Sequence, residues 1–216
     1  MYSLPSYIKN DTQFKEELYN IRASLCPHCS VMGNLICHGY LYGYAEDSSE
    51  KVHRGRRIFC TNRKRNSNGC GKTFSILYSD FIKSFSVRAL TLWRALKKIA
   101  SGKPIYRAFE NNVEKSLNAC ENNSDEHLDN DSTVNDRPCS NYSVSTAYAV
   151  WKSFKLNYFH IRSLLAKKRG PPKNCAATDP HTTTILHLEE TYPDSDCPVS
   201  TFQEGFGVPF LRANRL

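Results

Sequence analysis

The sequence contains no long apolar run. No stretch of the 216 residues approaches the roughly 18 apolar residues that a membrane-spanning helix requires. The first 25 residues carry charged side chains, among them Lys9 and Asp11, instead of the apolar core of a secretory signal. We therefore expect a cytoplasmic protein, in a reducing compartment where paired cysteines more often bind metal than form disulfides.

Acidic residues are missing from two long stretches. Residues 51–72 hold eight Lys or Arg and no acid, and residues 137–178 again hold eight Lys or Arg and no acid. Between them, residues 110–136 hold eight acids and one Lys, within a chain whose net charge is +8. Two cationic blocks separated by an acidic spacer predict two contact surfaces for one polyanion.

Motifs of common phosphate-processing enzymes are also missing. A phosphate-cradling loop needs GxxxxGK followed by Ser or Thr; Gly71-Lys72-Thr73 supplies that ending, but Asn66 stands where the upstream glycine belongs. A two-metal phosphoryl-transfer domain needs three carboxylates on a fold of about 100 residues or more. Only 51 residues follow Leu165, and no Arg-His-Arg set accompanies a candidate tyrosine nucleophile. We therefore expect a protein that is not an enzyme.

Four of the nine cysteines have the spacing of metal ligands. Cys26 and Cys29 are separated by two residues, and Cys60 and Cys70 by nine. Two such pairs predict a closed tetrahedral site of four sulfurs, which is the coordination that Zn²⁺ prefers. The alternatives are four unconnected cysteines, or a site in which a histidine replaces one sulfur. The possible substitute ligands, which would otherwise be polar loop residues or phosphate contacts, are His28, His38 and His53.

The segment between Cys60 and Cys70 is a basic insertion. We interpret it as a cationic finger carried by the second cysteine pair, and we expect it to neutralise DNA phosphates together with the arginines that precede it. The phosphate-contacting residues predicted in this block are Arg54, Arg56, Arg57, Arg63, Lys64 and Arg65.

The pattern of apolar residues predicts an α+β fold that is mostly α. We expect an N-terminal helix over residues 11–23, within a segment 1–25, with Asp11 as its cap. Strands are predicted over residues 35–44, 56–59 and 72–77, which makes residues 26–80 a small β zinc ribbon.

Residues 81–168 are predicted to form a helix-turn-helix-like domain. An apolar stripe over residues 89–100 predicts its first helix, and Ser101-Gly102-Lys103-Pro104 the turn into a short second helix over 104–111. Residues 111–140 form an acidic insertion that we expect to be flexible. A final helix is expected over 179–190, and the apolar tail, within residues 169–216, is expected to dock on the helical unit or on a partner.

The third helix of this domain is expected to begin near Ser143 or Ser145, and Asn157 to mark a kink or break in it. Its inward stripe is predicted to be Val144, Ala147, Tyr148, Trp151, Phe154, Tyr158, Ile161 and Leu165. Short polar side chains followed by lysines are typical of a helix that contacts bases in a major groove; the alternative is an ordinary amphipathic helix with a solvated face. The outward residues predicted to contact DNA are Ser145, Thr146, Ala149, Lys152 and Lys155.

Several sequence motifs resemble a known family. The series CPHC, HGYLYGY, RGRRIFC, a basic loop and GCGKTFS, followed by a helix containing LW, resembles the N-terminal zinc ribbon and helix-turn-helix of bacterial insertion-sequence transposases. It is more similar to short transposase-like proteins of bacterial mobile elements that have this front end alone. The segments STAYAVWKSF, KKRGPP and CPVSTFQEGFGVPFL are compatible with that group, whereas the acidic spacer is longer than its pattern requires.

The resemblance implies that the four cysteines hold Zn²⁺ and that the helices bind double-stranded DNA. We expect a non-catalytic DNA-binding protein that acts as an accessory or regulator of transposition. One alternative is the DNA-targeting subunit of a complex with a separately encoded transposase or recombinase. Another is a zinc-ribbon adaptor that binds proteins, with the apolar tail as its docking element.

Overall fold

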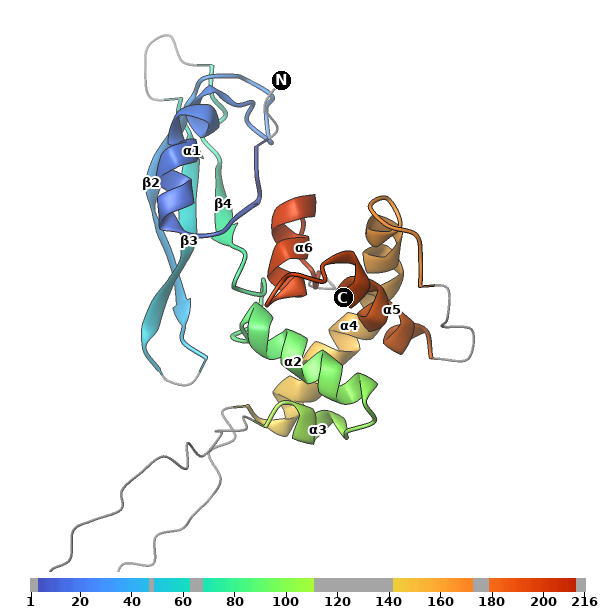
Figure 1. Cartoon of the computed structure of the whole chain (residues 1–216). Helices are drawn as coiled ribbons and strands as arrows, with labels where there is room; N and C mark the ends of the chain where they lie inside the picture. Colours follow the sequence, from blue (N-terminus) through green and yellow to red (C-terminus); the bar gives the residue numbers. More distant parts are fainter. Residues whose placement is uncertain (1–3, 47–48, 63–67, 111–141, 173–178, 213–216) are drawn as a thin grey trace, which may run out of the picture.

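The protein is built from a β lobe, residues 4–81, and a helical lobe, residues 82–212 (Figure 1). The computed structural model describes residues 4–46, 49–62, 68–110, 142–172 and 179–212. The expected α+β class is confirmed, with four strands in one sheet and six helices among the residues described. The elements are β1 (Tyr7–Ile8), α1 (Asp11–Ala23), β2 (Leu35–Tyr44), β3 (Lys51–Cys60), β4 (Thr73–Tyr78), α2 (Ala89–Ala100), α3 (Ile105–Ala108), α4 (Val144–Leu165), α5 (Pro180–Thr191) and α6 (Pro198–Phe206).

The β lobe is a sheet in the order β1-β4-β3-β2 with α1 packed on it. The pairs β2–β3 and β3–β4 are antiparallel, and the two residues of β1, which the apolar pattern did not predict, pair in parallel with β4. Phe14 and Ile21 of α1 are buried against Leu35, Ile58 and Ile76 of the strands. The N-terminal helix therefore shares the core of the sheet and is not a separate segment.

The helical lobe has its own core, to which every helix from α2 to α6 contributes. Leu92, Trp93 and Leu96 of α2 form the predicted apolar stripe. Of the two docking sites predicted for the apolar tail, the helical unit is the one seen in the structure, since Phe202, Phe210 and Leu211 lie in this core. The tail also contains a helix, α6, that was not predicted. Its Phe202 ring packs edge to face against the Phe210 ring, at a centroid distance of 5.3 Å.

Two predictions about α4 are wrong. The helix is continuous from Val144 to Leu165, so Asn157 marks no break; its amide is buried and donates to the Ser153 carbonyl oxygen at 2.8 Å. Val144 and Tyr148, predicted to face inward, are 60% and 48% exposed. The buried stripe instead includes Val150, and α4 packs against both α3 and α5.

Two sets of contacts hold the lobes together. From α6, the buried Gln203 amide donates to the carbonyl oxygens of Ser79 and Phe81, at 2.7 and 3.3 Å. The second set of contacts comes from the β2–β3 hairpin. The Arg54 guanidinium of β3 donates to the Phe85 carbonyl oxygen at 2.8 Å. The Glu46 carboxylate accepts from the Arg88 N–H at 2.9 Å. Because Arg88 is the N-cap residue of α2, the β2–β3 hairpin fixes where this helix begins.

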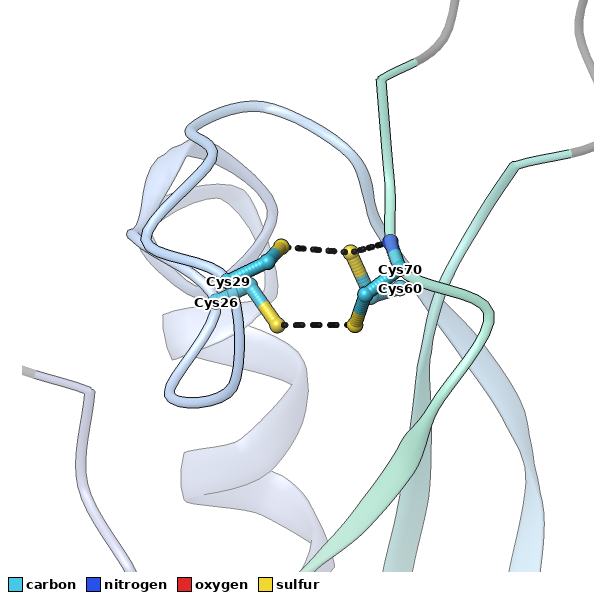
Figure 2. A group of neighbouring side chains, drawn as sticks. All are labelled: Cys26, Cys29, Cys60 and Cys70. Atoms are coloured by element: carbon cyan, nitrogen blue, oxygen red, sulfur yellow. Dashed lines mark hydrogen bonds between the residues drawn. The ribbon is translucent and has the colours of Figure 1, made fainter.

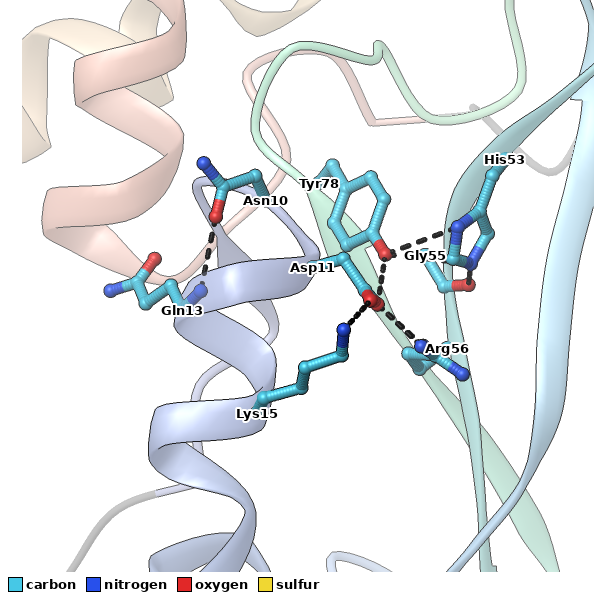
Figure 3. Close-up of polar contacts among 8 residues, drawn as sticks. All are labelled: Asn10, Asp11, Gln13, Lys15, His53, Gly55, Arg56 and Tyr78. Carbon is cyan, nitrogen blue, oxygen red and sulfur yellow. Dashed lines mark hydrogen bonds and ion pairs between the residues drawn. The ribbon is translucent and has the colours of Figure 1, made fainter.

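A polar network anchors α1 to the sheet (Figure 3). The cap of α1 is Asn10, whose side chain accepts from the Gln13 N–H, so the prediction of Asp11 as the cap is wrong. Asp11 Oδ1 instead accepts from Arg56 Nε at 2.8 Å, from Arg56 Nη2 at 2.6 Å and from the Tyr78 hydroxyl at 2.9 Å. Burial raises the pKa of Asp11, but the hydrogen bonds from Arg56 and Tyr78 lower it more, and the net pKa lies below its ordinary value. The resulting stabilisation is present at neutral pH and is lost as the pH falls through that lowered pKa.

No helix among the described residues is long and apolar enough to span a bilayer.

We predict that Asp11→Asn lowers the free energy of unfolding by about 2 kcal/mol at pH 7, because Arg56, a residue only 8% exposed, loses its charged partner. Urea denaturation measures this change. The matched control is Glu16→Gln, which removes the same charge from an exposed position on α1. Equal destabilisation by the two variants would contradict the role given to the Asp11–Arg56 pair.

Candidate metal centre and nucleic-acid interface

The four cysteines predicted from their spacing meet at one end of the sheet (Figure 2). Cys26 and Cys29 lie in the loop after α1, Cys60 is the last residue of β3, and Cys70 precedes β4. The four Sγ atoms lie within 4.8 Å of one another. The Sγ atoms of Cys26 and Cys70 are 3.8 Å apart, and those of Cys29 and Cys60 are 3.7 Å apart.

These distances fit a metal ion better than a disulfide. A tetrahedron of sulfurs around Zn²⁺ with Zn–S bonds of about 2.3 Å has S···S edges of about 3.8 Å. A disulfide would bring two sulfurs to about 2.05 Å. The four cysteines could therefore bind a metal ion such as zinc.

Both cysteine pairs have the same backbone geometry. The residue after the second cysteine adopts a positive φ in each pair, 58° at Ser30 and 70° at Gly71. Its N–H donates to the carbonyl oxygen of the first cysteine, at 2.8 Å from Ser30 to Cys26 and 3.0 Å from Gly71 to Cys60. The N–H of the first cysteine donates in turn to the carbonyl oxygen of the residue that follows this positive-φ residue. These bonds run from Cys26 to Val31 and from Cys60 to Lys72, both at 3.0 Å.

The nine-residue insertion does not distort the second pair because its base is closed. A Cβ at Gly69 would overlap the carbonyl oxygen of Thr61 and lie 3.0 Å from Cys60 Sγ, so these two chain segments touch. The Thr61 N–H also donates to the Asn34 carbonyl oxygen at 2.8 Å. Thr61 and Gly69 thus stand where the two spacer residues of a Cys-x-x-Cys turn would stand. Sequence spacing did not reveal this closure, although an Asn-Gly pair precedes Cys70.

Backbone hydrogen bonds lower the pKa of a cysteine thiol, whereas burial raises it. Cys26 Sγ accepts from the His28 N–H and Cys60 Sγ from the Cys70 N–H, both at 3.4 Å. A hydrogen bond from the Val31 backbone lowers the pKa of Cys29 to about 7, whereas burial raises the pKa of Cys60 to about 12. A bound divalent cation would hold all four as thiolates, since only the thiolate is a metal ligand.

None of the three candidate histidines belongs to the metal-binding group found among the described residues. The His28 ring lies against Phe74 and the His38 ring against Phe59, with centroids 6.3 and 5.5 Å apart. His53 lies in the network of Figure 3, where its ring is 3.3 Å from the Tyr78 hydroxyl. Cys37 and Cys197 are free thiols outside the cluster.

The basic residues predicted near the cysteines fall into three groups. Arg56 is buried and paired with Asp11, and Arg54 is half-buried with its guanidinium on backbone carbonyls, so both stabilise the fold. Arg57 is exposed on β3. Arg63, Lys64 and Arg65 lie outside the described residues.

The predicted base-contacting residues of α4 are mostly accessible. Ser145, Ala149, Lys152 and Lys155 are exposed, and Thr146 is half-buried with its N–H bonded to the Ser143 side chain. Next to them lie the exposed side chains of Val144 and Tyr148, which the apolar pattern had assigned to the core.

No family model, curated protein or solved structure matches the chain. The resemblance to transposase-like proteins therefore stays a prediction, and function is inferred from the residues and their geometry.

We predict that Gly69→Ala weakens metal binding at least tenfold, because a Cβ at this position has no room between Thr61 and Cys60. Titration of the apoprotein with Co²⁺, whose visible spectrum reports tetrahedral thiolate coordination, measures the affinity. The matched control is Gly170→Ala, where a Cβ meets nothing within 4 Å. A Gly69→Ala protein that binds Co²⁺ like the control would refute the closure of the insertion at its base.

Proposed function

We propose that this chain is a non-catalytic, zinc-dependent DNA-binding protein of a bacterial mobile element, acting as an accessory or regulator of transposition. The cysteine cluster would hold Zn²⁺ and order the β lobe. The helical lobe would bind double-stranded DNA. The assignment to a mobile element rests on the sequence resemblance alone.

The observation that carries the DNA-binding proposal is the segregation of charge between the helices. Residues 179–212, which contain α5 and α6, hold six acids and a single cation, Arg212. The described residues from 82 to 172, which contain α2, α3 and α4, hold one acid, Glu110. Their basic residues are Lys83, Arg88, Arg94, Lys97, Lys98, Lys103, Arg107, Lys152, Lys155, Arg162, Lys167, Lys168 and Arg169.

The positive charges gather around the end of α2 and the turn into α3. Arg94, Lys103 and Arg107 are exposed. Burial first, and then the nearby charges of Lys103 and Arg94, lower the pKa of Lys98. In Figure 1, α3 and α6 lie on opposite sides of α2. Cations that crowd one another on one face favour a polyanionic ligand, because each phosphate contact relieves their repulsion.

In this proposal α4 lies in the major groove and α2 and α3 contact the backbone, as in a helix-turn-helix protein. Contacts with bases are assigned to Ser145, Thr146, Ala149, Lys152 and Lys155. Arg57 and the finger residues Arg63, Lys64 and Arg65 would add phosphate contacts. Arg54 and Arg56 are not part of the proposed interface, because their guanidinium groups hold the fold together.

A protein-binding adaptor is the second candidate, favoured by the apolar part of the exposed face of α4. Leu156 is 59% exposed and Phe159 is 76% exposed, one turn apart on this helix. Large apolar side chains gathered on one surface often mark a protein contact. A separately encoded transposase or recombinase is the partner that the resemblance suggests.

We predict that removing three cations of the α2–α3 surface, with Arg94→Gln, Lys98→Gln and Lys103→Gln together, reduces the slope of log K against log[salt] by about 3 for a 20-base-pair duplex. Fluorescence anisotropy with zinc-loaded protein measures the slope. The matched control removes three exposed cations of the β lobe, with Lys9→Gln, Lys15→Gln and Arg22→Gln, and should leave the slope unchanged. A third variant, with Arg63, Lys64 and Arg65 changed to Ala, should flatten the slope by about 3 if the finger contacts phosphates.

An α2–α3 variant with the wild-type slope would remove this surface from the interface. If the wild-type protein retains zinc but binds no duplex DNA at about 50 mM salt, where the electrostatic contribution is strong, the DNA-binding proposal fails and the adaptor is favoured.

A further inference from the structure

The exposed side of β2 carries three tyrosines that the proposed duplex interface does not use. Tyr40, Tyr42 and Tyr44 are 49%, 57% and 60% exposed. They alternate along the strand, and in the motif HGYLYGY this period of two is visible in the sequence itself. We call these three residues the tyrosine ladder.

Each tyrosine of the ladder pairs with a basic or titratable residue on the neighbouring strand. In the register between β2 and β3, Tyr40 is opposite Arg56, Tyr42 is opposite His53, and Tyr44 is opposite Lys51. The whole of β3 lies within residues 51–72, which contain no acidic residue. Along this side of the β lobe, the exposed rings therefore lie beside His53 and the exposed cation Lys51, while the Arg56 guanidinium is paired with Asp11.

Two tyrosines of the ladder, Tyr40 and Tyr42, are held in place by their neighbours. The Tyr40 ring lies on the Arg56 guanidinium, at 3.7 Å from the ring centroid, and that guanidinium is fixed by Asp11. The His53 ring packs against Tyr40 at 4.5 Å and Tyr42 at 5.7 Å, and one of its nitrogens is 2.7 Å from the Gly55 carbonyl oxygen. Rings that are already fixed lose little conformational entropy when a ligand stacks on them.

The edge of β2 is a poor template for another β-strand. It is the last strand in the order β1-β4-β3-β2, but its register shifts between Cys37 and Gly39 and again between Leu41 and Tyr42. Irregularities of this kind protect edge strands against pairing. What the edge offers a ligand is therefore ring faces and charge rather than a regular row of backbone groups.

We propose that the tyrosine ladder binds a single-stranded polynucleotide, with bases stacked on Tyr42 and Tyr44 and a phosphate held by Lys51. Aromatic rings interleaved with cations are the combination that holds single strands without sequence preference, since every base has a face to stack. A duplex cannot use this surface, because its bases are already stacked on one another. The ladder is thus a second nucleic-acid site, separate from the duplex interface proposed for α2, α3 and α4.

The test measures fluorescence anisotropy of labelled dT15 and rU15 oligonucleotides and of a 20-base-pair duplex with zinc-loaded, full-length protein. Wild-type protein is expected to bind a single strand at about 50 mM salt. The double variant Tyr42→Ala with Tyr44→Ala should bind the single strand about 100-fold more weakly, because each of the two lost stacking contacts contributes about tenfold. Its affinity for the duplex should not change. Comparing dT15 with rU15 distinguishes a DNA strand from an RNA strand.

Two control variants separate stacking from other effects. The double variant Tyr42→Phe with Tyr44→Phe keeps the rings and should bind within about threefold of wild type. Tyr19→Ala removes a tyrosine of α1 that is 82% exposed and should leave binding unchanged. Wild-type protein that binds neither oligonucleotide, or a double alanine variant that binds them as wild type does, overturns the proposal whatever the duplex result.

Discussion

The junction of the four cysteines is the constraint on which the β lobe depends. Its sheet has four strands, one of them only two residues long, and its core is completed by a single helix. So small a sheet buries little apolar area, and a bound metal ion would supply much of its folding free energy. Cys26 and Cys29 follow α1, while Cys60 and Cys70 belong to β3 and the loop before β4. Joining the four sulfurs therefore joins the helix to the sheet.

The same junction explains how a basic insertion can interrupt one of the cysteine pairs. Contact between Thr61 and Gly69 closes the insertion at its base, so the backbone around Cys60 and Cys70 repeats the hydrogen bonds found around Cys26 and Cys29. The hydrogen bonds of Arg54 and Gln203 connect the β lobe to the helical lobe, so surfaces on the two lobes keep a fixed relation to each other.

Local sequence patterns predicted the features that depend on residues close together in the chain. The spacing of Cys26, Cys29, Cys60 and Cys70 predicted the cluster, and the apolar stripe of α2 predicted a helix of about fifteen residues where the structure has one of 12. Contacts between distant residues decided the rest. Arg56 resembled a phosphate ligand because sequence cannot show its pairing with Asp11, 45 positions away. Tyr148 resembled a core residue because it fits an apolar period, yet its side chain is 48% exposed, since a period alone does not show which side of a helix its neighbours cover.

The central claim is that the four sulfurs bind one zinc ion, and X-ray absorption at the zinc edge tests it most directly. We predict one zinc per chain surrounded by four sulfur neighbours at about 2.3 Å. Replacement of Cys60 by Ser should reduce the sulfur count by one or abolish zinc binding. Purified protein that holds no zinc after reconstitution under reducing conditions, or zinc coordinated mainly by nitrogen and oxygen, would contradict the account.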